Sequence, residues 1–290
     1  MIQPSQYQPG SQAVASISRL QQVWEHGGFA FTLQVLPFLA SSAETLKARA
    51  PTLLKGLDAV LVADAPAGTV ALSSVAQAVL LRRAGLSPIV QLSGRDRNRI
   101  ALQSELLGLG ALKLPDVLID MKPITRASLG QNSDARLVVD LDGPALLATA
   151  ARLRDEASFL SGARLKTPPA LYLGALIDLE NPLSAGSLEA AQFLVTEPPA
   201  HRRNLAETLS SFVRTSAGFL QHRPLLVSVP FAADASDTDE TSAEAFLAAL
   251  HLLKQVRAVR GWNIVVPDVA SLAALEQLAG AGQFSPERPG

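Results

Sequence analysis

The feature that most constrains the fold is a series of short, almost uninterrupted apolar runs that alternate with segments of helical periodicity. A strand of a parallel sheet is covered on both faces, so it reads as a continuous apolar run rather than as an alternation of apolar and polar residues. Eight such runs predict strands at 29–36, 59–63, 88–92, 117–120, 170–177, 192–196, 224–229 and 262–266. Helical segments are predicted after them at 43–55, 73–83, 97–112, 144–161, 187–190, 201–220, 243–259 and 269–279. Eight strands, each followed by a helix, predict a closed (β/α)8 TIM barrel.

The same alternation of predicted strands and helices indicates a single domain. Helical spacing at 16–25 indicates an extra helix before the first strand. Residues 1–15 offer little to bury and are predicted to be disordered, and residues 281–290 form a tail. No linker or shift of composition interrupts 16–280, and the 48% of hydrophobic residues is enough for one large core.

Composition excludes several classes of function. The net charge of -1 and 18% of charged residues argue against a nucleic-acid partner. The absence of cysteine excludes disulfides, thiolate zinc sites and cysteine nucleophiles, and the four histidines lack the spacing of metal ligands. No apolar run reaches the roughly 18 residues of a membrane span, and the N-terminus lacks a signal core. We therefore expect a cytoplasmic protein without a metal or membrane contact.

In this fold the active site lies where the strands end, so the polar residues at those ends are the candidates. Gln34 interrupts an apolar strand, and its amide points either into a polar barrel mouth, which we favour, or into a structural hydrogen bond. Asp64 either binds a ligand or caps a turn with Pro66 and Gly68, and the turn is favoured. The full set is Gln34, Asp64, Gln91 with Ser93, Asp120 with Lys122, Asp178, Thr196 with Glu197, Ser228 and Asp268.

The sequence supports two interpretations of Glu197 equally. A carboxylate at a desolvated barrel mouth can have a raised pKa and act as an acid or a base. It can equally pair with Arg202 or Arg203, which follow shortly after it.

The third strand is followed by the charged run from Ser93 to Arg99. A helix beginning there offers free amides to an anion. The alternative, with equal weight, is that Asp96 or Asn98 caps the helix and the arginines form a solvated first turn. The connection at 121–141 exceeds the usual length of such loops, which favours a functional role over that of a mere connector. Disorder of this segment is the remaining alternative.

The run from Arg95 to Ser104 resembles the methylenetetrahydrofolate reductase family, especially a bacterial branch of it. Other segments match that branch in order, so that the resemblance covers about residues 16–280. They are Ser18-Arg19-Leu20 through Gly28-Phe29-Ala30, Asp58 to Asp64 with Leu72-Ser73-Ser74, Pro88 to Leu92, Val139 to Asp142, Leu173-Gly174-Ala175 and Gln192 to Thr196.

The resemblance implies a flavoprotein oxidoreductase of folate one-carbon metabolism and methionine biosynthesis. Such enzymes bind FAD at the top of the barrel and reduce methylenetetrahydrofolate to methyltetrahydrofolate by hydride transfer from the reduced flavin. The expected cofactor is therefore FAD, unless it has been lost. The expected partners are a folate substrate and a further protein or a second copy of the chain.

The resemblance also implies roles for individual residues, several of which depart from the family pattern. Gln34 stands where the family has an acidic glutamate, Gln91 where it has a histidine and Glu197 where it has a glutamine. Lys122-Pro123 replaces a Gly-Asp pair, which leaves Asp120 as its nearest substitute, and Ala63 and Ala65 replace polar residues. The predicted catalytic residues are Gln34, Asp120 and Glu197, and the predicted cofactor-binding residues are Asp64, Gln91, Ser93, Lys122 and Arg136, the last near the FAD diphosphate.

These departures leave three hypotheses. The first is a methylenetetrahydrofolate reductase-like enzyme with altered active-site residues. The second is a non-catalytic, flavin-free barrel that acts as a pterin-binding, regulatory or partner subunit. The third is a different folate-linked transferase.

Overall fold

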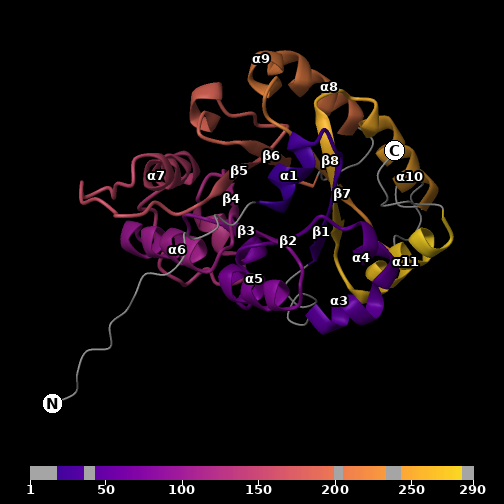
Figure 1. The fold of residues 1–290 in the computed structure, drawn as a ribbon, viewed down its shortest axis with the longest axis horizontal. Coiled ribbons are helices and arrows are strands. Elements are labelled where there is room, and N and C mark those ends of the chain that lie inside the picture. Colours follow the sequence, from indigo (N-terminus) through magenta and orange to yellow (C-terminus); the bar gives the residue numbers. More distant parts are fainter. Residues whose placement is uncertain (1–17, 36–42, 199–204, 233–242, 283–290) are drawn as a thin grey trace.

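The structure, a computed structural model, describes residues 18–35, 43–198, 205–232 and 243–282. Its core is a closed barrel of parallel strands in chain order, in which β8 pairs with β1 (Figure 1). The (β/α)8 TIM barrel predicted from the apolar runs is therefore confirmed. The strands are β1 (Ala30–Val35), β2 (Ala59–Val62), β3 (Pro88–Leu92), β4 (Asp116–Asp120), β5 (Tyr172–Ile177), β6 (Phe193–Thr196), β7 (Leu225–Pro230) and β8 (Val259–Val266).

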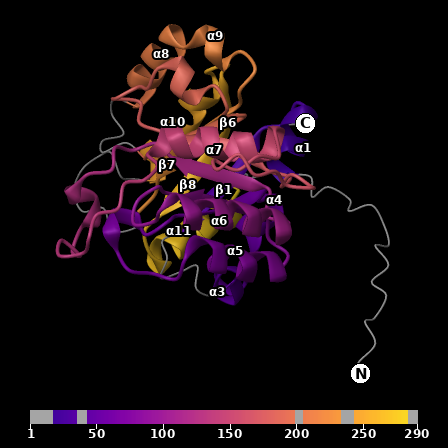
Figure 2. The same ribbon diagram turned by 90° about the vertical axis from the view of Figure 1, so that its left-hand side faces the viewer.

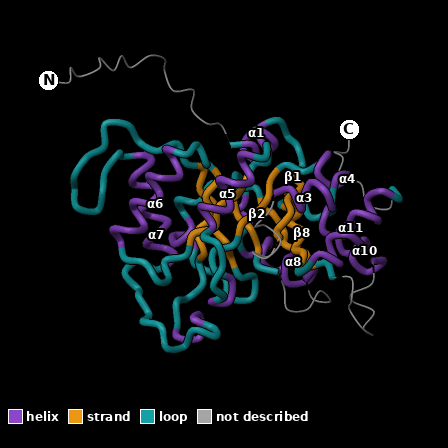
Figure 3. Tube along the Cα trace, turned by 90° about the horizontal axis from the view of Figure 1, so that it is seen from below, coloured by secondary structure: helices purple, strands orange, loops and turns teal. Residues whose placement is uncertain are grey.

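Helices surround the strands on the outside of the barrel (Figures 2 and 3). They are α1 (Arg19–Glu25), α3 (Ala43–Arg49), α4 (Pro51–Gly56), α5 (Ser74–Arg83), α6 (Arg99–Ala111), α7 (Gly143–Asp155), α8 (Leu205–Thr215), α9 (Ala217–Leu220), α10 (Ala243–Lys254) and α11 (Val269–Gly280). Three 3-10 turns, η1 (Pro66–Gly68), η2 (Arg126–Leu129) and η3 (Ala185–Leu188), lie in connections. In the described part of the chain, no helix is long and apolar enough to cross a membrane.

Several predicted helices are divided or shorter in the structure: 43–55 is divided into α3 and α4, 201–220 into α8 and α9, and 243–259 ends at Lys254. The helix predicted at 144–161 ends at Asp155, because Ala157 adopts a left-handed conformation with φ 50° that an α-helix cannot continue through. The extra N-terminal helix is present as α1, and its predicted residues 16 and 17 lie outside the described residues. The predicted N-terminal segment 1–15 and the tail from residue 283 lie outside them as well.

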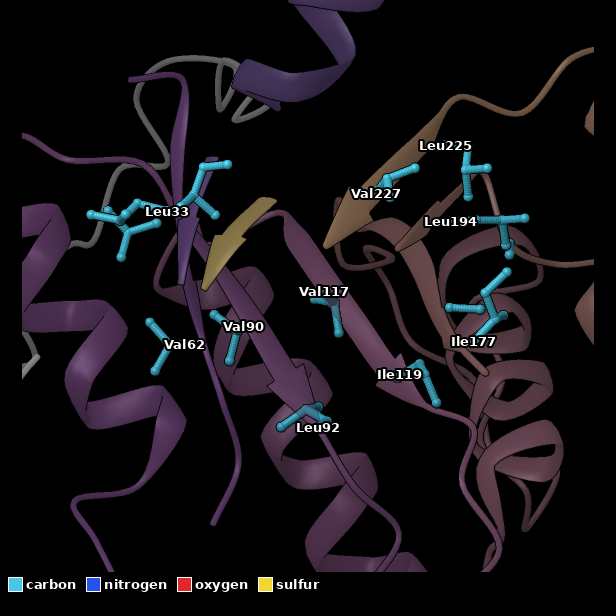
Figure 4. Close-up of a cluster of buried hydrophobic side chains, with 14 of the residues drawn as sticks. Leu33, Val62, Val90, Leu92, Val117, Ile119, Ile177, Leu194, Leu225 and Val227 are labelled. Atoms are coloured by element: carbon cyan, nitrogen blue, oxygen red, sulfur yellow. The ribbon is translucent and has the colours of Figure 1, made fainter. Parts of the chain in front are cut away.

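Side chains of the strands alternate between the helices and the barrel interior. The outward set packs against the helices, and Figure 4 shows part of it, with Leu33, Val90, Val117 and Leu194 among the labelled residues. The inward set forms a second buried cluster with residues of α1, namely Leu20, Val23, Trp24, Ala30, Ala59, Leu61, Ile89, Leu118, Tyr172, Leu176, Phe193, Val195 and Leu226. Alternation along each strand then assigns the polar residues near the strand ends to one side or the other.

Helix α1 closes the amino-terminal end of the barrel. Leu20 and Val23 are buried, and burial of such side chains stabilises the fold by about 2 kcal/mol each. The Trp24 ring lies 5.6 Å from that of Phe193, and its Nε1 donates to the Arg260 carbonyl at 2.9 Å. Ser18 caps the helix, and Arg19 pairs with Asp58 at 3.2 Å. This closure leaves the carboxyl ends of the strands as the open side of the barrel.

Candidate functional site at the barrel mouth

Polar side chains gather at the carboxyl ends of the strands, which we call the barrel mouth. Asn263 on β8 is the centre of one group: its Nδ2 donates to Gln34 Oε1 at 3.0 Å and to Ser228 Oγ at 2.9 Å. Its Oδ1 accepts from Thr32 Oγ1 at 3.0 Å. Because both ends of the Asn263 amide are used, this group forms a fixed wall of amides and hydroxyls from β1, β7 and β8.

The sequence analysis named Gln34 and Ser228 but missed Asn263. Asn263 is a polar residue within an otherwise apolar strand, which is the same signal that singled out Gln34. Both interpretations of Gln34 apply in part. Its side chain lies among the polar groups of the mouth, and its Oε1 also accepts a structural hydrogen bond from Asn263.

Asp120 forms the acidic side of the mouth. It accepts from Gln91 Nε2 at 3.1 Å and from the Lys122 backbone N–H at 3.0 Å. Burial raises the pKa of the Asp120 carboxyl above its ordinary value, and these hydrogen bonds and the charges of Lys122 and Arg95 oppose the rise without cancelling it. The strands therefore bring together Gln91, Asp120 and Lys122, all of which were predicted from the sequence.

Glu197 completes the acidic side from the end of β6. Its Oε2 lies 2.5 Å from Lys122 Nζ, and its side chain is 17% exposed. Its Oε1 is buried and has no hydrogen-bond partner among the described residues. Arg202 and Arg203, the alternative partners, lie outside the described residues. A buried carboxylate oxygen without a partner is costly, so it marks a place where a ligand can donate a hydrogen bond.

A rim of three connections surrounds this side of the mouth, and Arg95 joins them. Its guanidinium donates to the Ala65 carbonyl at 2.7 Å, to the Ser128 carbonyl at 2.5 Å and to Asp96 at 2.8 Å. Gly130 is required in the rim, because a Cβ there would lie 2.0 Å from the Ala67 carbonyl oxygen. Part of the long 121–141 connection is thus packed against the connection after β2.

The other charged residues after β3 also have partners inside the protein. Arg97 pairs with Asp64 and with Glu105, and Asp64 accepts from the Ser93 backbone N–H at 2.9 Å. Asn98 caps α6 by accepting from Ile100 N and Ala101 N, both at 3.0 Å. The capping interpretation is therefore right for Asn98, whereas Arg95 and Arg97 are largely buried rather than solvated.

Most of the residues predicted to hold FAD are engaged by other groups of the protein. Asp64 is engaged with Arg97, Ser93 supplies backbone and hydroxyl contacts to the rim, and Arg136 is exposed on the 121–141 connection. Of the predicted set only Gln91 and Lys122 face the mouth, where each contacts a carboxylate. A diphosphate needs N–H donors and uncompensated positive charge, so these residues do not fit it. No comparison tests FAD or a folate ligand directly, and both stay predictions.

Comparisons with known proteins give no family for the chain. No family model matches, and no curated protein matches. Among solved structures, a GH18 chitinase from Pseudoalteromonas aurantia is 13% identical with a TM-score of 0.44, covering 85% of this chain and 98% of that one. An endo-beta-N-acetylglucosaminidase from Cordyceps militaris is 13% identical with a TM-score of 0.48, covering 90% and 94%. A GH113 beta-1,4-mannanase is 9% identical with a TM-score of 0.40, covering 88% and 97%.

The prediction of a methylenetetrahydrofolate reductase is wrong on these findings. No family model and no curated protein supports the resemblance. The predicted oxidoreductase activity in folate one-carbon metabolism and methionine biosynthesis is wrong with it. The physical reason lies in the rim, where Arg95, Arg97 and Asn98 serve the local structure instead of a cofactor. Because the TM-scores are below 0.5, the neighbours' activities carry no argument for this chain.

Proposed function

We propose that the barrel mouth is the active site of an enzyme that cleaves a glycosidic bond in a neutral, hydroxyl-rich small molecule, with Asp120 as general acid and Glu197 as general base. The observation that supports the proposal is the pair of carboxyl groups in contrasting surroundings. Burial keeps the pKa of Asp120 raised, whereas Glu197 is paired with the Lys122 ammonium. Carboxyl groups held in different environments are the usual basis for dividing acid and base roles.

The charge of the mouth supports a neutral substrate. Asp120, Asp178 and Glu197 face Lys122 and Arg95, and both cations already contact acceptors of the protein. With Asp120 protonated as the general acid, two carboxylates face two cations, so the mouth has no excess positive charge to hold a phosphate or carboxylate ligand. The group around Asn263 is uncharged, and its partly exposed member is Gln34. The Gln34 amide suits a sugar hydroxyl, because a hydroxyl both donates and accepts.

Strand geometry supports the action of two separate carboxyl groups on one substrate. Asp120 lies on β4 and Glu197 follows β6, so β5 separates them and their backbones are roughly 10 Å apart across the sheet. Both side chains lie on the inward side, so their carboxyl groups enter the mouth from strands two positions apart around the barrel. Cleavage of a glycosidic bond needs one carboxylic acid to protonate the leaving oxygen and one carboxylate to activate water or attack the sugar. Gln91 positions the acid, and Lys122 positions the base.

The test is release of nitrophenol from a panel of neutral 4-nitrophenyl glycosides between pH 5 and pH 8. We expect activity with at least one glycoside, and a loss of about 100-fold or more in kcat for both Asp120→Asn and Glu197→Gln. Asp155→Asn, a change of the same kind at an exposed residue paired with Arg154, should leave kcat unchanged.

Thermal unfolding with added ligands tests the substrate class separately, because a ligand that binds the folded state raises its stability. Neutral oligosaccharides should stabilise the protein more than the corresponding sugar phosphates do. Stronger stabilisation by the phosphates would contradict the neutral mouth. Turnover that survives both carboxyl substitutions would remove Asp120 and Glu197 from the reaction.

A further inference from the structure

Gln34 is the member of the polar group around Asn263 that remains accessible from the mouth. The side chains of Thr32, Ser228 and Asn263 are each 0% exposed. Gln34 at the end of β1 is half-buried, and it lies on the inward side of the strand because its neighbour Leu33 packs against the helices. Within this group, therefore, Gln34 is the residue that a molecule in the mouth can contact.

The hydrogen bonds of Asn263 fix which end of the Gln34 amide faces the mouth. Asn263 Nδ2 donates one hydrogen to Gln34 Oε1 at 3.0 Å and the other to Ser228 Oγ at 2.9 Å. Turning the Gln34 amide over would bring its N–H groups against those of Asn263, and a buried N–H would lose its acceptor. An unpaired donor of this kind disfavours the turned amide by about tenfold or more. Gln34 therefore holds its oxygen towards Asn263 and its nitrogen away from it.

The nitrogen of the Gln34 amide still has hydrogens to donate. In the part of the chain that the structure describes, no acceptor meets Gln34 Nε2. An amide nitrogen donates and cannot accept, whereas a hydroxyl does both. The mouth thus offers a ligand a donor from β1, in addition to the unpaired acceptor Oε1 of Glu197 after β6.

Gln34 lies across the mouth from the two carboxyl groups. Counted around the closed barrel, β1 is three strands from β4, which carries Asp120, and three strands from β6, which Glu197 follows. A substrate in contact with Asp120 and Glu197 has to extend towards the other wall to reach Gln34. Gln34 is therefore placed to contact a part of the substrate that is remote from the bond that breaks.

We propose that Gln34 determines substrate specificity in the mouth by donating a hydrogen bond from Nε2 to a substrate oxygen that is remote from the cleaved bond. This inference rests on the proposed function and adds a requirement to it. The substrate has to present a hydroxyl, ether or carbonyl oxygen to Gln34, and an amino sugar with an ammonium group at that position is disfavoured because donor would face donor.

Steady-state kinetics of Gln34→Glu and Gln34→Met, with a 4-nitrophenyl glycoside that the wild type cleaves, test the proposal. Glutamate keeps an oxygen for Asn263 Nδ2 but lacks the amide hydrogens, and methionine lacks both groups. Both variants should raise KM at least tenfold and keep kcat within about threefold, because a contact remote from the cleaved bond is equally strong in the bound substrate and in the transition state. Gln277→Glu is the matched control, since it makes the same change at an exposed residue of α11, and it should leave KM unchanged.

NMR of protein labelled with nitrogen-15 glutamine tests the contact without turnover. The side-chain amide signal of Gln34 is the one that disappears in Gln34→Glu, and that of Gln277 is assigned in the same way. The 4-nitrophenyl glycosides of the panel are added to the labelled wild type and to the labelled Asp120→Asn variant, in which cleavage is suppressed. At least one glycoside should shift the Gln34 signal and leave the Gln277 signal in place.

Thermal unfolding of each variant shows whether it is folded, and if Gln34→Met does not fold, the shift of the Gln34 signal decides. Turnover by the wild type with an unchanged KM in both Gln34 variants would overturn the role of Gln34 and leave the proposed function standing. A raised KM in folded Gln34→Glu but not in folded Gln34→Met would do the same, since the added charge would then be the cause. If no glycoside is cleaved but the Gln34 signal shifts, the proposed function fails and the contact between Gln34 and the sugar is upheld. Absence of both turnover and a shift overturns both.

Discussion

Asp116 provides a prediction in which the structure fixes both the sign and the size of the effect. It lies at the amino-terminal end of β4 beneath α1, and it is 2% exposed. Ser18 donates a hydrogen bond to the carboxyl group, but Oδ1 has no hydrogen-bond partner among the described residues. Burial, the largest cause, raises the pKa of Asp116 from 3.8 to about 7, although the Ser18 hydrogen bond opposes the rise.

The raised pKa makes stability fall as pH increases. Below pH 3.8 the Asp116 carboxyl is protonated in both the folded and the unfolded chain, so folding buries no charge and the stability associated with the protonated carboxyl is fully present. Between pH 3.8 and about 7 only the unfolded chain releases the proton, and the contribution is lost as pH rises through the folded-state pKa. A shift of about 3 units corresponds to about 4 kcal/mol in the free energy of unfolding.

Asp116→Asn removes the ionisation while keeping the shape of the side chain. The amide brings an N–H group that the site does not satisfy, which costs about 1–3 kcal/mol. At pH 8 the variant should therefore be more stable than the wild type by about 1–3 kcal/mol, because it avoids burial of a charge worth about 4 kcal/mol. At pH 5 it should be equally or less stable. Urea unfolding followed by tryptophan fluorescence at both pH values measures the difference.

Asp58→Asn is the contrasting control at the same end of the barrel. The Asp58 carboxylate accepts from the Phe31 backbone N–H at 3.0 Å and pairs with Arg19 at 3.2 Å. Loss of its charge should therefore reduce stability at both pH 5 and pH 8. If the difference between Asp116→Asn and the wild type is the same at the two pH values, the argument from burial is refuted.

Two further predictions concern single contacts. Gly108→Ala on α6 should stabilise the protein by about 0.5–1 kcal/mol, because the added Cβ would meet nothing within 4 Å. Gly110→Ala on the same helix should destabilise the protein by about 1–3 kcal/mol, because the added Cβ would lie 2.6 Å from the Cβ of Pro169. Equal midpoints of urea unfolding for the two variants would contradict this. Glu276 of α11 accepts from Thr52 N at 2.7 Å and Leu53 N at 2.9 Å, which replaces the side-chain cap that α4 lacks. Glu276→Ala should therefore cost about 1–2 kcal/mol, and no loss relative to the exposed neighbour Gln277→Ala would count against this capping role.

The sequence predicted the barrel because parallel strands are recognisable one at a time. The strand at 88–92 was predicted with its observed bounds, since Pro88 begins it and a polar turn ends it. Strand β8 begins at Val259, whereas the sequence predicted a start at 262. The prediction was late because Arg260 and Gly261 interrupt the apolar run on which it was based. Gly261 is nevertheless suited to the strand, since a Cβ there would lie 2.5 Å from the Ala30 carbonyl oxygen. A rule based on the hydrophobicity of neighbouring residues in the chain cannot predict this steric requirement, because it comes from β1.

The candidate site was less predictable because its contacts join residues that are distant in the chain. Position at a strand end was enough to nominate Asp120, Lys122 and Glu197 separately. The pairing of Lys122 with Glu197 depends on the spacing of β4 and β6 around a closed barrel, which no local pattern contains. The pairing of Asp64 with Arg97 was missed for the same reason, and Asp64 was assigned to a turn or a ligand instead.

The charged run after β3 shows when a motif is evidence for function. Arg95 joins three connections of the rim, Arg97 pairs with Asp64, and Asn98 caps α6, so the architecture alone accounts for these three residues. A barrel with a similar rim can need such residues whatever it binds, because the contacts are made to the protein's own backbone and carboxylates. Glu197 is the opposite case, since its Oε1 is buried without a partner in the described part of the chain. No described residue offsets the cost of that buried oxygen, and a ligand in the mouth could do so. For this reason the functional proposal rests on Glu197 with Asp120 rather than on the arginines.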